Sequence, residues 1–287
     1  MPQHLLLRPI RRAHAEWRRF RAAEKEWRKH LRQRLQNPSG KSRPIFLVGC
    51  GRSGTSMLVY HLARSWQVEL YNEDHPAAFE QWRLRDLPVL DSLLERSYAP
   101  FVLFKPILDT HRTLLLLARF PDAKVLFTFR HYTDVIHSSL KRFGTENRIN
   151  HVRGWMNEDF AEFATAPPPQ ETRAFIRSLW NPALSPESGA ALYWLFYNRL
   201  YFDLGLKGDA RVKLVRYESV VANPKPEFQD LCRFLGIPFE SQMVEGIFAS
   251  SVKQAEPPNL DPAVRQACDA LWQQLCREIE AARPAPA

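Results

Sequence analysis

The stretch that decides the fold is residues 46–56, Phe46-Leu47-Val48-Gly49-Cys50-Gly51-Arg52-Ser53-Gly54-Thr55-Ser56. An apolar strand runs into a glycine-rich turn, and an apolar helical pattern follows at once. Glycines let backbone N–H groups approach a ligand, and the first turn of a helix offers unpaired donors to an anion. The guanidinium of Arg52 and the hydroxyls of Ser53, Thr55 and Ser56 would add hydrogen bonds to phosphate oxygens. The stretch predicts a phosphate-binding loop.

This loop differs from that of the nucleotide triphosphatases, whose pattern is G-x-x-x-x-G-K-[ST]. Gly49 and Gly54 have the required spacing, but Thr55 occupies the lysine position and Arg52 stands three places earlier. The lysine that reaches the β- and γ-phosphates of a nucleoside triphosphate is therefore absent. The loop predicts a phosphate ligand other than ATP. An ordinary tight strand-to-helix turn is the plainer alternative.

Length and composition favour one α/β domain in a reducing compartment. The 287 residues, 45% of them hydrophobic, suffice for one large core. The cysteines lack metal-site or C-x-x-C spacing and indicate no disulfide framework; they are Cys50, Cys232, Cys268 and Cys276. No apolar run reaches the length of a membrane span, and the N-terminus lacks the apolar segment of a signal peptide. We expect a cytoplasmic enzyme that is soluble or lies at the inner membrane face.

Positive charge is concentrated in an N-terminal arm, residues 1–38. Residues 1–36 hold 11 Lys or Arg against 3 Glu, which is +8 of the total charge of +9, so the rest of the chain is near neutral. Apolar residues fall on one helical stripe, interrupted at Glu24; they are Trp17, Phe20, Trp27, Leu31 and Leu35. Asn37-Pro38-Ser39-Gly40 marks the end of this basic amphipathic helix.

The arm has three interpretations. A basic helix with aromatic residues on one side suits an anionic membrane surface, so residues 8–36 are a candidate for peripheral membrane contact. The stripe can equally dock on the chain's own domain, or on a twin subunit in a homodimer, and docking is the simpler expectation. Nucleic acid is the least favoured partner, because the rest of the chain carries no run of basic residues that would extend the positive charge of the arm.

From Pro44 onward, short apolar segments alternate with amphipathic ones. The predicted strands are 44–49, 67–70, 101–104, 124–129 and 211–216. The predicted helices are 54–65, 76–95, 109–119, 132–142, 171–180, 188–205, 225–235 and 262–281. This alternation predicts an α/β, P-loop-containing, three-layer fold with a central, mostly parallel sheet and helices on both faces.

The catalytic domain is expected over residues 43–282. Within it, residues 144–187 interrupt the alternation of predicted strands and helices and contain a Pro167-Pro168-Pro169 run. We interpret them as an insertion or lid over the acceptor site, at the carboxyl edge of the sheet where ligands bind in open α/β folds. Residues 283–287 are expected to form a disordered tail.

A second informative stretch is the strand that ends at Arg130 and the helix that follows it. A nucleotide triphosphatase often ends such a strand with a metal-binding aspartate, whereas this one ends with an arginine. Ser138 and Arg142 lie one turn apart on the same face of the helix. The three residues can converge on a second phosphate. Taken singly, a surface ion pair would explain Arg130 and a solvent-facing position would explain Ser138, but the first loop favours phosphate binding.

These motifs resemble the sulfotransferases that use 3′-phosphoadenylyl sulfate (PAPS). The family's R/K-S-G-T-[ST] loop, which holds the 5′-phosphosulfate, is matched by Arg52-Ser53-Gly54-Thr55-Ser56. Its strand-closing arginine and the serine eight residues later, which bind the 3′-phosphate, are matched by Arg130 and Ser138. Its R-Y-E-x-[LV] and F-L-G-[IL]-P segments are matched by Arg216-Tyr217-Glu218-Ser219-Val220 and Phe234-Leu235-Gly236-Ile237-Pro238.

The resemblance covers residues 44–255. An arginine-type loop looks more like the tyrosylprotein, carbohydrate and bacterial branches than the cytosolic small-molecule enzymes, which carry lysine there. The chain also departs from the family. The usual R-[DN]-P is here Arg130-His131-Tyr132, so the turn loses its proline restraint. Residues 144–187 fit no family pattern, which leaves the acceptor pocket undefined.

The resemblance implies three catalytic residues. Arg52 and Lys105 would stabilise the leaving phosphate, although Lys105 could also be a solvated strand-end lysine. Glu73 would be the base that deprotonates the acceptor, because a carboxylate shielded from water can have its pKa raised toward the working pH. Its neighbours Asp74 and His75 are rivals, and this polar trio could instead cap a helix starting at residue 76.

The resemblance also implies the rest of the donor site. Tyr217 would lie near the adenine or ribose, and Ser250 and Lys253 would belong to a C-terminal segment that closes over the donor. The donor would be PAPS and the product 3′,5′-ADP (PAP), with no metal expected.

The sequence thus predicts a PAPS-dependent sulfotransferase acting on a hydroxyl, with a sugar or glycolipid acceptor ahead of tyrosine. One alternative is a P-loop small-molecule kinase using ATP and Mg²⁺. The absence of lysine at Thr55 and of an acidic residue at Arg130 speaks against it. The other is an inactive nucleotide-binding scaffold that the basic arm recruits to a membrane.

Overall fold

A computed structural model gives the structure of the protein over residues 7–163, 166–248 and 256–282, without the side chains of residues 7–20, 22 and 282. Its central sheet has five parallel strands in the order β2-β5-β1-β6-β7. The strands are β1 (Arg43–Gly49), β2 (Val68–Tyr71), β5 (Phe101–Phe104), β6 (Lys124–Phe129) and β7 (Val212–Arg216). The five predicted strands are confirmed, each to within one residue at either end.

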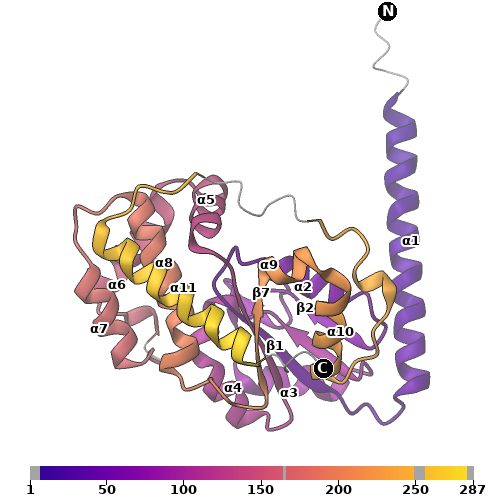
Figure 1. Cartoon of the computed structure of the whole chain (residues 1–287). Helices are drawn as coiled ribbons and strands as arrows, with labels where there is room; N and C mark the ends of the chain where they lie inside the picture. The colour runs from indigo at the N-terminus through magenta and orange to yellow at the C-terminus, as the bar shows by residue number, and fades with distance from the viewer. Residues whose placement is uncertain (1–6, 164–165, 249–255, 283–287) are drawn as a thin grey trace, which may run out of the picture.

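Alternation of side chains along the central strand builds two cores, one on each face of the sheet. On β1, Ile45 and Leu47 join the core beneath α2 (Thr55–Leu62), α9 (Tyr217–Ala222) and α10 (Pro224–Leu235). Phe46 and Val48 point to the other face, beneath α4 (Thr113–Arg119), α5 (Tyr132–Phe143), α8 (Pro186–Asp203) and α11 (Pro262–Ala282). Figure 1 shows the helices on both sides of the sheet, so the three-layer α/β fold is confirmed.

The predicted helix at 76–95 is wrong over its first half. Residues 79–84 form a two-stranded antiparallel hairpin, β3 (Phe79–Glu80) and β4 (Arg83–Leu84), and only α3 (Leu87–Arg96) is helical. Gln81 and Trp82 turn the hairpin with positive φ angles of 48° and 67°, which a helix does not allow. The predicted helix at 109–119 is present but divided into a 3₁₀ helix, η1 (Ile107–Arg112), and α4.

Residues 144–187 are largely helical. They form α6 (Glu146–Asn157), the short 3₁₀ helix η2 (Ala161–Phe163) and α7 (Gln170–Leu179), and α8 begins at Pro186. Helix α6 lies very close to α8, because a Cβ atom on Gly189 would lie 2.4 Å from the Cβ of Ile149. The segment is thus packed on the catalytic body. Its role as an insertion or lid stays a prediction.

The arm forms one helix, α1 (Leu7–Gln36), and its N-terminal half projects away from the body (Figure 1). Its other half is anchored by polar contacts. Lys29 donates a hydrogen bond to the carbonyl of Ala63 (2.9 Å), and Gln33 donates to that of Trp66 (2.8 Å). Within the described part of the chain, no helix is both long and apolar enough to cross a membrane.

The three stripe residues of α1 whose side chains are described are exposed rather than packed on the body. Trp27 is 63% exposed, Leu31 43% and Leu35 70%. The expectation that these side chains pack on their own domain is therefore wrong. The face of α1 that meets the body carries Lys29 and Gln33 instead. These side chains donate hydrogen bonds to backbone carbonyls beyond the end of α2, which need partners away from water.

We expect Gly189→Ala to lower the free energy of unfolding by about 1–3 kcal/mol, because the added methyl group overlaps Ile149 in a packed core. Urea denaturation measures this change. Gly154→Ala is the matched control on α6, since nothing lies within 4 Å of its added Cβ. It should leave stability unchanged or raise it by roughly 0.5–1 kcal/mol. Equal effects of the two substitutions would contradict the close approach of α6 and α8.

Candidate active site

The phosphate loop is fixed where β1 ends. A Cβ on Gly49 would lie 2.2 Å from the carbonyl oxygen of Thr128 on β6, so only glycine fits there. The N–H of Gly49 donates to the hydroxyl of Thr110 (2.9 Å), and the same hydroxyl donates to the Gly49 carbonyl (3.1 Å). Arg52 and Gly54 then turn the chain with φ angles of 71° and 78°. The loop is therefore held by its neighbours before any ligand binds.

The three sequence motifs meet at one cavity of about 270 Å³ at the carboxyl edge of the sheet. Its lining comes from the phosphate loop, the end of β6, helix α5 and the start of α9, namely Arg52, Gly54, Thr55, Ser56, Met57, Arg130, Ser138 and Tyr217. All of these except Met57 are residues that the sequence predicted. Ser53 lies buried in the same loop, and its hydroxyl oxygen has no hydrogen-bond partner among the described residues. A buried hydroxyl that lacks a hydrogen-bond partner, in a loop with positive charge, fits an anionic ligand.

Arg52 lies at the centre of the positive charge. Its Nε donates a hydrogen bond to Ser138 Oγ (3.0 Å), which joins two residues predicted for different phosphates. Burial lowers the pKa of its guanidinium below the ordinary value, and the neighbouring arginines lower it further. Those neighbours are Arg142, Arg148 and Arg130. Arg142 itself is exposed and does not line the cavity.

Arg130 is a buried residue rather than a surface ion-pair partner. Its guanidinium contacts the Asp134 carboxylate (3.1 Å) and lies 4.5 Å from the centre of the Tyr217 ring. That ring also packs directly on the loop, because a Cβ on Gly54 would lie 2.1 Å from it. Sequence reasoning missed Asp134. The signal was its spacing of four residues from Arg130, which brings the two side chains together at the start of α5.

The turn after Arg130 is restrained without a proline. The backbone N–H of His131 donates to the carboxylate of Glu218 (2.8 Å), which follows β7. The ring of His131 in turn accepts a hydrogen bond from the N–H of Thr133 (3.3 Å) and caps α5. A carboxylate and an N-cap therefore fix the turn.

The predicted catalytic residues lie beside the loop. Lys105 is only 2% exposed, and its Nζ donates to Ser56 Oγ (3.0 Å) and contacts the Glu73 carboxylate (3.1 Å). It is therefore not a solvated strand-end lysine. Asp74 and His75 are exposed, and they accept hydrogen bonds from Asn72 and from the N–H of Ala77. No helix starts at residue 76, so the helix-cap interpretation of the trio is wrong.

Other predictions have no structural test. Ser250, Lys253 and the tail 283–287 lie outside the described residues. In the described ranges, no group of three or more His, Cys, Asp or Glu side chains is placed to hold a metal ion.

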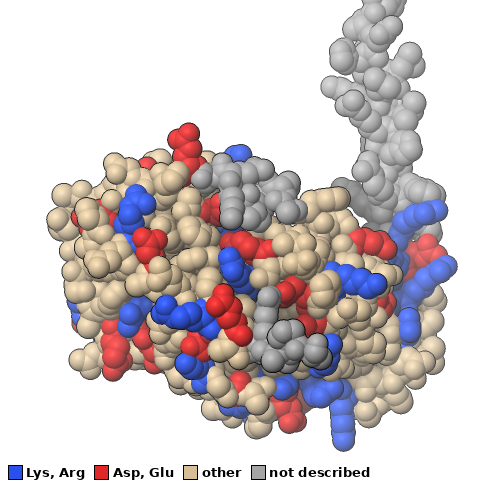
Figure 2. Space-filling model, in the orientation of Figure 1, with Lys and Arg blue, Asp and Glu red and all other residues tan. Residues whose placement is uncertain are grey.

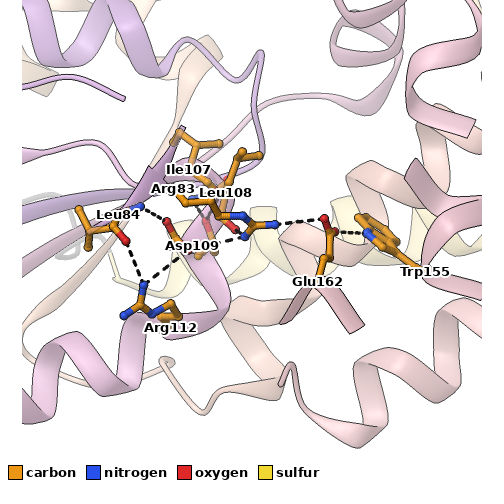
Figure 3. A network of polar contacts seen from close by, with 10 residues as sticks. Arg83, Leu84, Ile107, Leu108, Asp109, Arg112, Trp155 and Glu162 are labelled. Carbon is orange, nitrogen blue, oxygen red and sulfur yellow. Dashed lines mark hydrogen bonds and ion pairs between the residues drawn. The ribbon is translucent and has the colours of Figure 1, made fainter. Parts of the chain in front are cut away.

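A partly buried polar network ties the segment after α6 to the hairpin (Figure 3). Arg83 contacts Glu162 (3.3 Å) and Asp109 (3.6 Å), and Glu162 also accepts a hydrogen bond from the Trp155 indole. The Asp109 carboxylate accepts the N–H of Leu84 (2.6 Å). The network therefore fixes one end of α6 against the edge of the catalytic body.

His111 lies beside this network, and its ring packs edge-on against Phe163, 4.7 Å between centres. Burial, followed by the positive charges of the nearby Arg83 and Arg112, lowers the pKa of His111 from 6.5 to about 3. The folded state therefore holds the neutral ring, whereas the unfolded chain takes up a proton near pH 6.5.

We expect the free energy of unfolding to be largest above pH 6.5 and to fall as the pH drops toward 3. His111 alone contributes a slope of about 1.4 kcal/mol per pH unit within that window. Urea denaturation between pH 4.5 and 7.5 checks this. His111→Phe should flatten the slope, while His151→Gln, at an exposed position, should leave it unchanged. A His111→Phe protein as acid-sensitive as the wild type would refute the assignment.

Comparisons with known proteins identify the family of this chain. A family model described as the sulfotransferase domain matches residues 42–256. A search of curated proteins gave no match. Among solved structures, the sulfotransferase domain from the curacin biosynthetic pathway is 17% identical, with a TM-score of 0.52, over 80% of this chain and 98% of that chain. At this identity the likeness shows the fold.

Two further solved structures are more distant in shape. A sulfotransferase from Alicyclobacillus acidocaldarius is 19% identical over 83% of this chain and 95% of that chain, with a TM-score of 0.46. Mouse sulfotransferase SULT7A1, complexed with PAP, is 16% identical over 82% of this chain and 85% of that chain, with a TM-score of 0.42. Because the family model covers most of the chain, this protein belongs to the sulfotransferase family, the transferases that use PAPS.

Proposed function

We propose that this protein transfers a sulfuryl group from PAPS to a hydroxyl of a carbohydrate or glycolipid, with Glu73 as the base. The observation that carries the proposal is the contact between Lys105 and Glu73 beside the phosphate loop. The ammonium of Lys105 lies 3.0 Å from Ser56 and 3.1 Å from Glu73. A group that can stabilise a leaving oxygen and a group that can take a proton are therefore adjacent.

The donor would be held at both of its anionic ends. The loop residues Arg52, Ser53, Gly54, Thr55 and Ser56 would bind the 5′-phosphosulfate through side chains and backbone N–H groups. Arg130 and Ser138 would bind the 3′-phosphate, and the Tyr217 ring between them and Gly54 would contact the adenosine. Arg142 would act from the exposed rim, and the resemblance adds Ser250 and Lys253.

PAPS supplies an activated sulfuryl group, whose bond to the phosphate oxygen breaks as the acceptor oxygen bonds to sulfur, by analogy with in-line phosphoryl transfer. Glu73 would take the proton of the acceptor hydroxyl. Arg52 and Lys105 would neutralise the charge that develops on the phosphate oxygen left on PAP. Fixed donors of this kind stabilise developing charge strongly when water is excluded, and Lys105 is almost fully buried.

Ligand binding separates this proposal from the two alternatives. PAP should raise the melting temperature of the protein, whereas ATP with Mg²⁺ should not, because the lysine of the ATP loop is missing. Stabilisation by ATP and Mg²⁺ alone would favour the kinase. PAP binding without turnover, against a broad panel of sugar, glycolipid and tyrosine acceptors, would favour the inactive scaffold.

We expect Glu73→Gln to lower kcat by about 10²–10⁴-fold, because the amide cannot accept the acceptor proton. Its affinity for PAP should stay the same, since Glu73 is not needed to hold the donor. Steady-state transfer assays and calorimetry measure the two quantities. Asp74→Asn is the matched control at the neighbouring exposed carboxylate and should keep wild-type turnover. Full activity of Glu73→Gln would remove Glu73 as the base.

We further propose that α1 contacts an anionic membrane surface. Its stripe residues Trp27 and Leu31 are exposed, and the helix carries most of the net charge of the chain. On the visible face of the body, acidic and basic residues are interspersed (Figure 2), so the body supplies no competing basic track. Exposed aromatic and apolar residues on a basic helix suit the interface of an anionic bilayer, where a glycolipid acceptor would reside.

We expect the full chain to sediment with phosphatidylserine vesicles and not with phosphatidylcholine vesicles, and added salt should weaken the binding. Trp27→Glu combined with Leu31→Glu should abolish sedimentation. Leu114→Glu, at an exposed position on α4, is the control and should not affect sedimentation. Loss of a dimer in the double variant, without any vesicle binding by the wild type, would identify the stripe as a homodimer contact instead.

A further inference from the structure

Arg148, on α6, is a buried cation that the sequence did not single out. Its side chain is only 8% exposed. Its guanidinium lies close to two aromatic rings, 4.0 Å from the centre of Tyr193 and 4.6 Å from that of Phe143. Across the described ranges it has no ion pair, and its Nε has no hydrogen-bond partner. A buried charge without a counter-ion is costly, so its retention calls for an anion.

The guanidinium lies against the phosphate loop. The Nη2 atom of Arg148 is 3.6 Å from the position that a Cβ on Gly51 would occupy. Arg148 and Arg52 share the ring of Phe143, which lies 5.9 Å from Arg52 Cζ. Arg148 also helps to lower the pKa of the Arg52 guanidinium, as expected of two close positive charges. Arg148 does not line the cavity itself, but its guanidinium lies against the loop that does, so its charge acts on that loop.

The charges near the loop show what Arg148 adds. Lys105 contacts the Glu73 carboxylate, and Arg130 contacts the Asp134 carboxylate. Each of these cations is therefore offset by an acid. The 5′ end of PAPS carries negative charge on both its phosphate and its sulfate. Arg142, which also lies near Arg52, is exposed to water, so Arg148 would add a buried cation that has no acidic partner among the described residues.

We propose that Arg148 is a donor-binding residue for the 5′-phosphosulfate, supplied by α6 from the 144–187 segment. This inference rests on the proposed function and deepens it. It assigns part of the donor site to a segment in which the sequence analysis found no motif. The packing of α6 at Gly189 and the anchoring of Trp155 through Glu162 hold Arg148 in place.

The test compares PAP with 3′-AMP, which lacks the 5′-phosphate, by calorimetry on the full chain. The dissociation constant of 3′-AMP divided by that of PAP measures the contribution of the 5′-phosphate to binding. Arg148→Gln should lower that ratio about tenfold to a hundredfold, the worth of a hydrogen bond to a charged group. Its affinity for 3′-AMP should not change. Arg153→Gln, at an exposed position on the same helix, should keep the wild-type ratio.

Equal weakening of PAP and 3′-AMP binding by Arg148→Gln would show a structural role and overturn the inference, as would no change in either. If Arg148→Gln does not fold, by circular dichroism, Arg148→Lys replaces it. Lysine keeps the charge but loses the forked hydrogen bonds, so a partial fall in the ratio is expected and an unchanged ratio overturns the proposal. A wild-type protein that binds neither nucleotide would instead refute the proposed function.

Discussion

The site depends on the gathering of cations at the carboxyl edge of a parallel sheet. Arg52, Arg130 and Lys105 follow three different strands, and the two buried ones, Arg130 and Lys105, each contact an acid at 3.1 Å. Guanidinium and ammonium groups removed from water need such partners, or an anion, to offset lost hydration. The rigid turn at Gly49 and the polar contacts of Lys105 hold these groups in place. Under the proposed function, these groups would form a preorganised anion site for a nucleotide that carries an anionic group at each end.

Sheet topology explains why the cavity forms between β1 and β6. The helix that follows β1, α2, packs on one face of the sheet, whereas the helix that follows β6, α5, packs on the other. Adjacent parallel strands whose connections leave in opposite directions open a crevice at their carboxyl ends, and ligands bind there in open α/β folds. The phosphate loop and Arg130 lie on the two sides of that crevice. The hydrogen bond between Arg52 and Ser138 spans it.

Features governed by local chemistry could be predicted from the sequence. The apolar strands, the glycines of the loop, Arg130 and Tyr217 each leave a short pattern in the chain, and the cavity is lined almost entirely by such residues. Lys105 and Glu73 came from the family resemblance, and their mutual contact was not foreseen. The hairpin at 79–84 was missed because it depends on a distant partner. The carboxylate of Asp109, 25 residues after Leu84, accepts a hydrogen bond from the backbone N–H of Leu84. Such a long-range partner overrides helical periodicity and leaves no local signal.

Arg148 shows the same limit for function. In the sequence it is one of many arginines, in a segment without a recognisable motif, and its value depends on the packing of α6 against α8 at Gly189. That packing belongs to the core on one face of the sheet, whereas α2 and α9, which carry Thr55, Ser56 and Tyr217, belong to the core on the other. A donor held by residues from both sides would link the two cores through one ligand. A ligand that binds only the native state stabilises that state by mass action. Unpaired charges that destabilise the free protein would therefore favour the folded, donor-bound form.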